Sequence, residues 1–433
     1  MWAEKLKLNK QLVRSVTEAG YFTPKEVQLK TLTRIIGGQD VIVVSSEGSG
    51  KTTAYILGVL MRLKYGFEEA PRALILVPDK EKVLEVVAKF ELLNKNASIR
   101  VVGLYPEPSM QAQLDALADG TDIVVATPDR ARAIYLKLGL NLNKIMMFVV
   151  DDAAEIVKQG AQLPVVELAN SIIKCQHLVF TGVMHGKLQQ MIDPFMHMAA
   201  LVEVEELGEP KAEIHEQVLY HLPNFRTKLN LLSLLLEEAE LYTKAAVFVN
   251  TRLTAEKVYN SLRIDIKGEV AILNPMMFES KGFGSIDEFK DQTEVRVLII
   301  ATELQGPLNL DEIPYLFHFE LPEEKETFIG RMIKPAGDNV PDTLSITFAT
   351  DMELDMVKKI EQAIGQKIEE NELPDSLLIA KEQKDIKANK QTVTSKTNAV
   401  TSGGAFHEKK PSNNKDYNYS AGTKAKMSNK KKH

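Results

Sequence analysis

The residues best suited to chemistry lie in one stretch, Ser45 to Thr52, which reads SSEGSGKT. Glycines within such a stretch let the chain turn its backbone N–H groups inward around an anion, and a following helix adds partial positive charge. Lys51 can then reach the terminal phosphates of a nucleotide, and the hydroxyl of Thr52 can bind Mg²⁺. The spacing predicts a nucleotide-binding loop made of Ser45, Ser46, Glu47, Gly48, Ser49, Gly50, Lys51 and Thr52.

The segments on either side of this loop have the pattern that such a site requires. Residues 41–44 read VIVV, a β-branched run typical of a strand buried on both faces. After the loop, apolar side chains recur at helical spacing at Tyr55, Ile56, Val59 and Leu60. The usual pattern starts with glycine, where this chain has Ser45. The alternative is a chance surface turn, and the buried strand and the apolar helix argue against it.

Strands and helices alternate through the first half of the chain. Apolar runs predict strands at residues 73–78, 99–103, 122–126 and 144–150, and helical patterns occupy residues 80–93 and 111–117. This alternation predicts a parallel sheet with helices on both faces. Ligands of such sheets bind at the carboxyl ends of the strands.

Two acids stand at one of these strand ends. Asp151 can hold Mg²⁺ opposite Thr52. Asp152 is placed to orient or deprotonate a water that attacks the γ-phosphate. The alternative is that both acids cap the next helix. The phosphate loop upstream favours the metal role for Asp151.

Length and composition bound the remaining possibilities. The chain has 433 residues, of which 44% are hydrophobic and 26% charged, so we expect a soluble protein of two or three domains. No apolar run approaches the roughly 18 residues that cross a bilayer, and the first residues do not resemble a secretory signal. Cys175 is the only cysteine, which excludes an internal disulfide and favours a buried structural thiol over a nucleophile. We therefore expect a cytoplasmic location and no membrane partner.

Charge is distributed unevenly along the chain. Residues 381–433 hold 13 lysines, no arginine and four acids, a net charge of +9, which leaves −15 on residues 1–380 of a chain whose total is −6. The same segment has few large apolar side chains and should be disordered. Its lysines, with Tyr417 and Tyr419, suit contact with single-stranded nucleic acid. A tail that serves only solubility is the alternative.

The order of these signals resembles the DEAD-box RNA helicase family over roughly residues 8–362. Gln28, with Gly20, Tyr21 and Pro24, resembles the motif that reads adenine, and Ser45 to Thr52 resembles motif I. Further likenesses follow the family's order: Pro78 to Glu81 (PTRE), Thr127 to Arg130 (TPGR), Asp151 to Ala154 (Asp-Glu-Ala-Asp), Thr181 to Val183 (Ser-Ala-Thr), Ala245 to Arg252 (motif IV), Val295 to Thr302 (motif V) and Leu321 to Arg331 (the run into motif VI).

The resemblance implies a fold and a set of ligands. The fold would be α/β with two tandem RecA-like domains, at residues 1–207 and 214–372, joined by a linker at 208–213 and followed by a disordered basic tail at 373–433. The ligands would be ATP, Mg²⁺ and RNA, single-stranded or structured, bound by a monomer. The residues implied for RNA contact are Thr127, Pro128, Arg130, Asn250, Thr251 and Thr302.

Several positions depart from the family pattern in motifs II, III, V and VI, so we expect a divergent member. Asp152 replaces a glutamate, and Ala154 and Val183 remove an acid and a hydroxyl that the family couples. In motif V, Pro307 and Leu310 replace an arginine and an aspartate. The two later arginines of motif VI correspond to Lys334 and Gly337. Lysine keeps the charge of an arginine without its planar fork, whereas glycine keeps neither.

Three functions fit these residues. The first is an ATP-dependent RNA helicase or remodelling protein with weakened hydrolysis, in which Lys51, Asp151, Asp152 and Lys334 carry the chemistry. The second is a catalytically impaired protein that binds ATP and RNA as a clamp or assembly factor. In either case, a protein partner could supply the missing catalytic groups. The third is a DNA-directed motor, which the residues around Gln28 disfavour.

Overall fold

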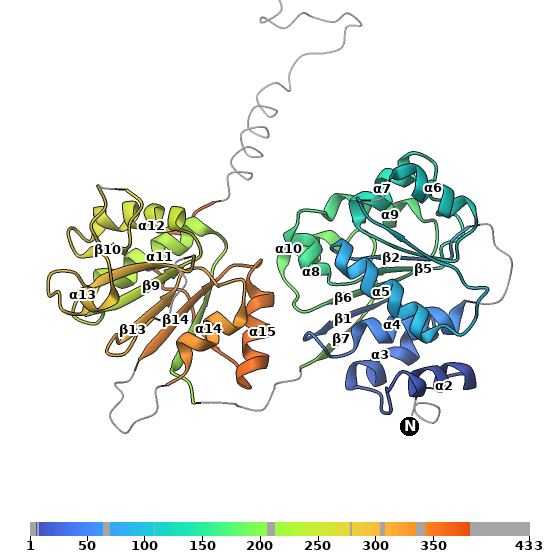
Figure 1. Cartoon of the computed structure of the whole chain (residues 1–433), viewed down its shortest axis with the longest axis horizontal. Helices are drawn as coiled ribbons and strands as arrows, with labels where there is room; N and C mark the ends of the chain where they lie inside the picture. Colours follow the sequence, from blue (N-terminus) through green and yellow to red (C-terminus); the bar gives the residue numbers. More distant parts are fainter. Residues whose placement is uncertain are drawn as a thin grey trace, which may run out of the picture. The chain divides into compact units, whose positions relative to one another are not determined.

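The computed structural model describes residues 6, 8–63, 70–107, 109–205, 213–277, 279–303, 308–334 and 343–381. Contacts between residues separate 1–380 from 381–433, and of the second segment only Lys381 is described. The described residues build two parallel sheets with helices on their faces (Figure 1). The expected fold class, α/β with two tandem sheets, is confirmed. No helix among these residues is both long enough and apolar enough to span a bilayer.

The first sheet has seven strands in the order β3-β4-β2-β5-β6-β1-β7, and all of its neighbours are parallel. The strands are β1 (Val41–Ser45), β2 (Ala73–Leu76), β3 (Val101–Leu104), β4 (Ile123–Ala126), β5 (Met147–Val150), β6 (Gln176–Thr181) and β7 (Ala200–Val204). The helices are α2 (Lys10–Glu18), α3 (Glu26–Ile36), α4 (Lys51–Arg62), α5 (Lys80–Leu93), α6 (Met110–Ala118), α7 (Pro128–Leu136), α8 (Ala153–Lys158), α9 (Gln162–Ser171) and α10 (Gly186–Ile192).

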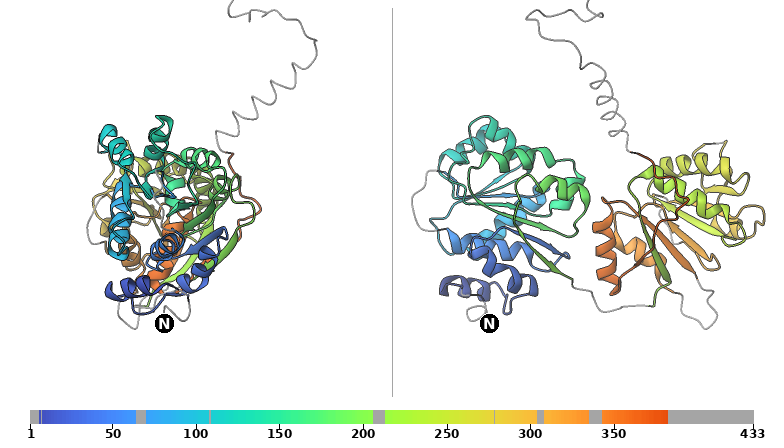
Figure 2. Two further views of the ribbon diagram at one scale, coloured as in Figure 1. Left: turned by 90° about the vertical axis from the view of Figure 1, so that its right-hand side faces the viewer. Right: turned by 180° about the vertical axis from the view of Figure 1, so that it is seen from behind.

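Helices cover both faces of this sheet, as Figures 1 and 2 show. Helices α2 to α5 pack on one face through residues such as Val16, Ile35 and Phe90. Helices α7 to α10 pack on the other face through residues such as Ile134 and Leu168. Every residue of β1, β2, β4 and β5 is buried. Strands buried on both faces need the continuous apolar runs that the sequence shows.

The strand order determines where a ligand can bind. Strands β6 and β5 lie between β1 and β2, so the chain crosses over after β1 and the order reverses there. Open α/β sheets bind ligands at this switch point, outside the carboxyl ends of the strands. The Ser45 to Thr52 loop follows β1, Asp151 follows β5, and Thr127 follows β4. The topology therefore gathers at one edge residues that are far apart in the sequence.

The second sheet has eight strands in the order β11-β10-β12-β9-β13-β14-β8-β15, again with parallel neighbours. The strands are β8 (Glu216–His221), β9 (Ala245–Val249), β10 (Val270–Leu273), β11 (Gly282–Phe283), β12 (Val297–Ala301), β13 (Tyr315–His318), β14 (Leu344–Ala349) and β15 (Glu369–Glu370). Helices α11 (Phe225–Glu237) and α12 (Arg252–Asp265) cover one face, and α13 (Ile286–Lys290), α14 (Lys325–Met332) and α15 (Leu354–Ile364) cover the other.

The packed chain continues beyond residue 372, where we expected the tail to begin. Leu377 is buried in the core beside α11 and α12. The side chain of Asn224 donates a hydrogen bond to the Ala380 carbonyl at 2.6 Å, and the Ala380 N–H donates to Thr227 Oγ1 at 3.1 Å. These contacts hold residues 377–380 against α11. Residues 382–433, most of the basic tail, and 206–212, most of the expected linker, lie outside the described residues.

A fully buried histidine lies at the end of β13. The His318 ring stacks on Phe248 with a centroid distance of 5.2 Å and meets Phe328 at 4.3 Å. Within the described part of the chain, neither of its ring nitrogens has a hydrogen-bond partner. Burial, together with the nearby Arg331 guanidinium, holds the pKa of His318 well below its ordinary value. The imidazole is therefore neutral in the folded protein.

This histidine predicts a loss of stability in acid. In the unfolded chain its pKa returns to about 6.5, so below that pH the unfolded state binds one proton more and the unfolding free energy falls. Replacing His318 with Leu should remove this contribution to the pH dependence of the unfolding free energy. From pH 7 to pH 5.5 the variant should lose about 1 kcal/mol less unfolding free energy than the wild type, measured by urea titration. The matched control, His197→Leu at an exposed position, should follow the wild type. An unchanged pH dependence in His318→Leu would contradict this reading.

Candidate phosphate and metal site

The loop between β1 and α4 has the backbone that an anion site requires. Gly48 has φ of 78° and Gly50 has φ of 95°, both in the left-handed region that side chains rarely adopt. Gly50 is constrained a second time, because a Cβ there would lie 2.5 Å from Nε2 of Gln28. The loop ends directly at the N-terminus of α4, whose first residue is Lys51.

Lys51 is buried and folded back over its own loop. Its Nζ donates to the carbonyl oxygens of Ser45 at 2.6 Å and Ser46 at 2.9 Å. Burial lowers the pKa of Lys51, and the carboxylates of Asp152 and Asp151 oppose this shift. The hydroxyls of Ser45 and Ser49 are 2.9 Å apart beneath the loop. The lysine is thus held in the loop by oxygen atoms that phosphate oxygens can replace.

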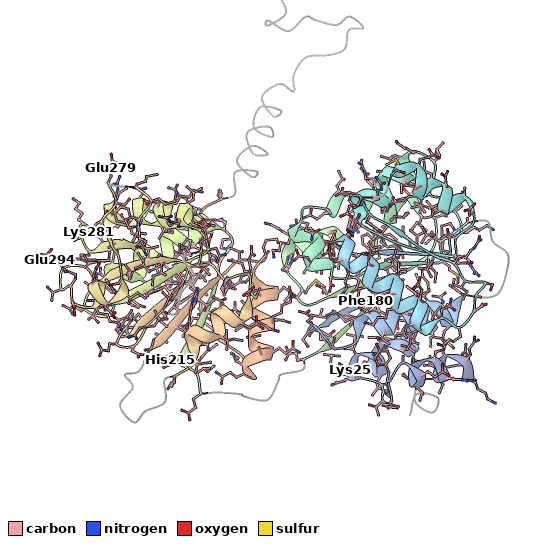
Figure 3. All side chains as sticks on the ribbon, viewed as in Figure 1. Lys25, Phe180, His215, Glu279, Lys281 and Glu294 are labelled. Atoms are coloured by element: carbon pink, nitrogen blue, oxygen red, sulfur yellow. The ribbon has the colours of Figure 1, made fainter. Side chains whose placement is uncertain are left out.

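Gln28 lies against the same loop, as its resemblance to the adenine-reading motif implies. It is buried near the start of α3, where its Oε1 accepts from the Lys25 N–H at 2.8 Å and its Nε2 donates to the Gly50 carbonyl at 3.3 Å. Lys25, labelled in Figure 3, also donates from Nζ to the Gly48 carbonyl. A glutamine amide has two N–H donors and two acceptor lone pairs. One N–H donor and one acceptor lone pair of the Gln28 amide are therefore left for a ligand.

Asp151 is almost completely buried at the end of β5, with 1% of its surface exposed. Its Oδ2 accepts from Thr52 Oγ1 at 3.3 Å and from the Tyr55 hydroxyl at 2.9 Å. Burial and the neighbouring Asp152 raise the pKa of Asp151 to about 6. The structure brings together the two residues that the sequence assigned to Mg²⁺.

Tyr55 is a site residue that sequence analysis missed. The sequence placed it on the inner, apolar face of a helix, and its ring does pack on Phe180 with a centroid distance of 5.3 Å (Phe180 is labelled in Figure 3). Its hydroxyl reaches Asp151. A buried tyrosine hydroxyl usually has a hydrogen-bond partner. A tyrosine at a buried helical position was therefore the signal in the sequence that could have identified this residue.

Asp152 has a left-handed backbone, with φ of 49° and ψ of 48°, at the N-cap of α8. Its Oδ2 lies 3.3 Å from Nζ of Lys82, a second residue that sequence analysis did not select. Lys82 is in the first turn of α5, directly after β2. The cavity beside the loop is lined by residues of three strand ends, including Ser49, Lys51, Thr52, Pro78, Lys82 and Asp152.

The positions that depart from motifs II and III lie close to this cavity. Ala154, which lines it, has no polar side chain, and Val183 is buried. Thr181 donates from Oγ1 to the Val183 carbonyl at 2.8 Å, so its hydroxyl is used locally. Of the departures in motifs V and VI, Pro307 and Gly337 lie outside the described residues.

Residues implied for RNA contact in the first half lie at the end of β4. Thr127 is the N-cap of α7 and Pro128 is its first residue. Thr127 Oγ1 is buried without a hydrogen-bond partner among the described residues. Arg130 donates from Nε to Gln113 Oε1 at 2.6 Å.

The corresponding residues of the second half gather at the ends of β9 and β12, where Val249 pairs with Ala301. Asn250 donates from Nδ2 to the Leu321 carbonyl at 2.9 Å, and Thr251 caps α12. Thr302 accepts from Arg331 Nη2 at 3.0 Å. Lys334 follows α14, and its backbone N–H donates to the Glu213 carbonyl at 3.0 Å.

Two other possibilities are weaker than this site. Cys175 is half-buried, and burial with the nearby Asp40 raises its pKa to about 12, so its thiol remains protonated. The described residues contain no group of three or more His, Cys, Asp or Glu side chains arranged for a metal. One carboxylate with one hydroxyl beside a phosphate loop suits Mg²⁺, which takes few protein ligands and completes its shell with phosphates and water.

Comparison with known proteins agrees with this geometry. Residues 25–191 match the family model described as DEAD/DEAH box helicase. The ATP-dependent RNA helicase DeaD of Mycobacterium tuberculosis is 24% identical over 371 residues, which cover 85% of this chain and 64% of that protein. The ATP-dependent RNA helicase eIF4A of Candida albicans is 25% identical over 366 residues, covering 84% of this chain and 91% of that protein.

The chain therefore spans less than two thirds of DeaD and most of eIF4A. Among solved structures, a DEAD box protein from Methanococcus jannaschii is 20% identical, with a TM-score of 0.48 and coverage of 85% of this chain and 98% of that one. The family model covers the loop from Ser45 to Thr52, Asp151 and the strand ends that hold them. By these matches the chain is similar to DEAD/DEAH box helicases over residues 25–191 and to ATP-dependent RNA helicases over most of its length.

Proposed function

We propose that this chain is an ATP-dependent RNA helicase or RNA-remodelling protein that binds ATP with Mg²⁺ and single-stranded RNA and hydrolyses ATP weakly. The observation that carries the proposal is the hydrogen bond between Thr52 and Asp151. It lies beside a loop whose lysine, Lys51, donates to a carbonyl of the same loop. This is the arrangement that P-loop enzymes use to hold a metal and the phosphates it neutralises. The family relationship supports the same reaction class.

Each residue of the site has a role in this proposal. Backbone N–H groups of the loop and Nζ of Lys51 bind the phosphates, and the remaining donor and acceptor of Gln28 read adenine. Thr52 and Asp151 hold Mg²⁺, which supplies positive charge at the phosphates. Asp152 orients the attacking water. Thr127, Pro128, Arg130, Asn250, Thr251 and Thr302 contact the RNA backbone, and Lys334 provides charge to the transferred phosphate.

Weak hydrolysis follows from the side chains at the reacting phosphate. Asp152 is one methylene shorter than the glutamate it replaces, and misplacing a reacting group by about 1 Å can cost about 100-fold in rate. Lys334 stands where the family supplies an arginine, which is worth about 10³ to 10⁵ in comparable enzymes. A lysine retains the charge but not the bidentate geometry.

A second function is a protein that binds ATP and RNA without productive turnover, such as a clamp or an assembly factor. The specific observation in its favour is the ion pair between Asp152 and Lys82, which engages the carboxylate that would orient water. A partner protein that supplies an arginine would reconcile the two functions.

Turnover of ATP with and without RNA tests the proposal. The wild type should bind ATP with Mg²⁺ and hydrolyse it slowly, faster with RNA than with DNA, and Lys51→Ala should abolish both activities. Lys334→Arg should raise RNA-stimulated turnover by about tenfold or more, because the planar fork contacts two phosphate oxygens. The matched control is Lys325→Arg, at the first residue of α14, which should leave RNA-stimulated turnover unchanged.

Two results would contradict this proposal. Rapid RNA-stimulated turnover by the wild type, abolished in Lys51→Ala, would show that hydrolysis is not weakened. No binding of any purine nucleotide in calorimetry would remove the proposed function altogether. RNA binding without detectable turnover, with or without Lys334→Arg, would favour the clamp.

The hydrogen bond from Tyr55 to Asp151 predicts a change in metal dependence. Groups that orient a metal ligand typically contribute 10-fold to 100-fold to metal affinity. Tyr55→Phe should therefore raise the Mg²⁺ concentration for half-maximal ATP binding by about tenfold. Nucleotide binding without metal should stay unchanged. Tyr242→Phe, at a buried tyrosine of the second sheet, is the control. An unaltered Mg²⁺ dependence in Tyr55→Phe would show that Thr52 alone positions the carboxylate.

A further inference from the structure

Lys82 is a charged side chain in the cavity that the proposed mechanism leaves unused. It belongs to the first turn of α5, and its backbone N–H donates to Asp79 Oδ1 at 2.8 Å in the helix cap. Its Nζ lies 3.3 Å from Asp152 Oδ2 and 3.1 Å from Glu85 Oε2. The side chain is 23% exposed, so it extends along the cavity wall rather than into solvent.

The charges around Lys82 keep it positive. Burial alone would lower its pKa, but the carboxylates of Asp152, Asp151 and Glu85 outweigh burial and raise the pKa above its ordinary value. Lys51 is the other ammonium group whose charge interacts with Lys82 in this cavity. The loop lysine and the α5 lysine thus both interact with the charges of the two aspartates, and each lysine follows a different strand.

The position of Lys82 relative to Asp152 indicates which phosphate it would meet. Thr52 and Asp151 mark the metal position, and Asp152 is the acid placed beside the attacking water and the last phosphate. A cation in contact with Asp152 therefore lies at the γ-phosphate end of the cavity. An ammonium group has three donors, so Lys82 can keep Asp152 and still donate to a phosphate oxygen.

We propose that Lys82 contacts the γ-phosphate of bound ATP and supplies, from the first sheet, part of the charge that the motif VI arginines provide in the family. This inference rests on the proposed function. It gives Lys82 a role that depends on the third phosphate, so the residue should distinguish ATP from ADP. A purely structural ion pair with Asp152 would not distinguish them.

Titrations of fluorescent ATP and ADP in the presence of Mg²⁺ test this role in the full chain. Lys82→Met keeps the length and the apolar stem of the side chain and removes the charge. A charge-assisted hydrogen bond is worth about 10-fold to 100-fold in affinity. Lys82→Met should weaken ATP binding by that factor, change ADP binding by less than about twofold, and slow RNA-stimulated turnover. Lys82→Arg should retain most of the preference for ATP.

Lys89→Met is the matched control, because Lys89 lies on the same helix and pairs with the same Glu85, at 3.6 Å. It should keep the wild-type ratio of ATP to ADP affinity. Equal losses of ATP and ADP affinity in Lys82→Met, or no loss of either, would overturn the proposal. Faster turnover in Lys82→Met would also overturn it, since Lys82 would then restrain Asp152. Absence of nucleotide binding by the wild type would instead be the failure of the proposed function itself.

Discussion

A single buried carboxylate connects two elements of the first sheet that are not neighbours. Asp151 follows β5, yet both of its side-chain donors, Thr52 and Tyr55, come from α4, the helix that follows β1. Strand β6 lies between β5 and β1. These two hydrogen bonds therefore fix the phosphate loop relative to a strand two positions away. They join Asp151 to the beginning of α4, which also holds Lys51.

Such a group is expensive to bury, and the surrounding residues show how the fold accommodates it. Removing a carboxylate from water disfavours its charged form, and the pKa of Asp151 rises to about 6 through burial and the adjacent Asp152. The positive charges of Lys51 and Lys82 oppose this shift and lower the pKa of Asp151. The same lysines are thus needed to balance the acids and are positioned to meet phosphates. A cavity with this balance gains from a ligand that brings both a divalent cation and negative oxygens.

The sequence was sufficient for features that local chemistry determines. Left-handed glycines, an unbroken β-branched run and a following apolar helix leave few alternatives for Ser45 to Thr52, and the alternation of strands and helices predicted both the sheet and Asp151 at its edge. Tyr55 could not be predicted in the same way, because its spacing is that of a core residue and only the strand order brings its hydroxyl to Asp151. The packing of residues beyond 372 could not be predicted for a related reason. Leu377 opens a short apolar run that ends at Ala380, and only the packed core beside α11 shows that it is an anchor.

The departures around the cavity form a consistent set when they are considered with their contacts. Ala154 lacks the acid that would engage the Thr181 hydroxyl, and Thr181 bonds the Val183 carbonyl instead. Asp152, shorter than the family's glutamate, is met by Lys82 from α5. The polar groups left at these two positions therefore have partners within the first sheet and its helices. Asp151 itself is buried, accepts hydrogen bonds from two hydroxyls and interacts with the charge of Lys51. The geometry of this sheet is therefore a glycine-bearing loop, an inward-turned lysine and a buried carboxylate joined to Thr52, with Lys82 as a further positive charge beside Asp152.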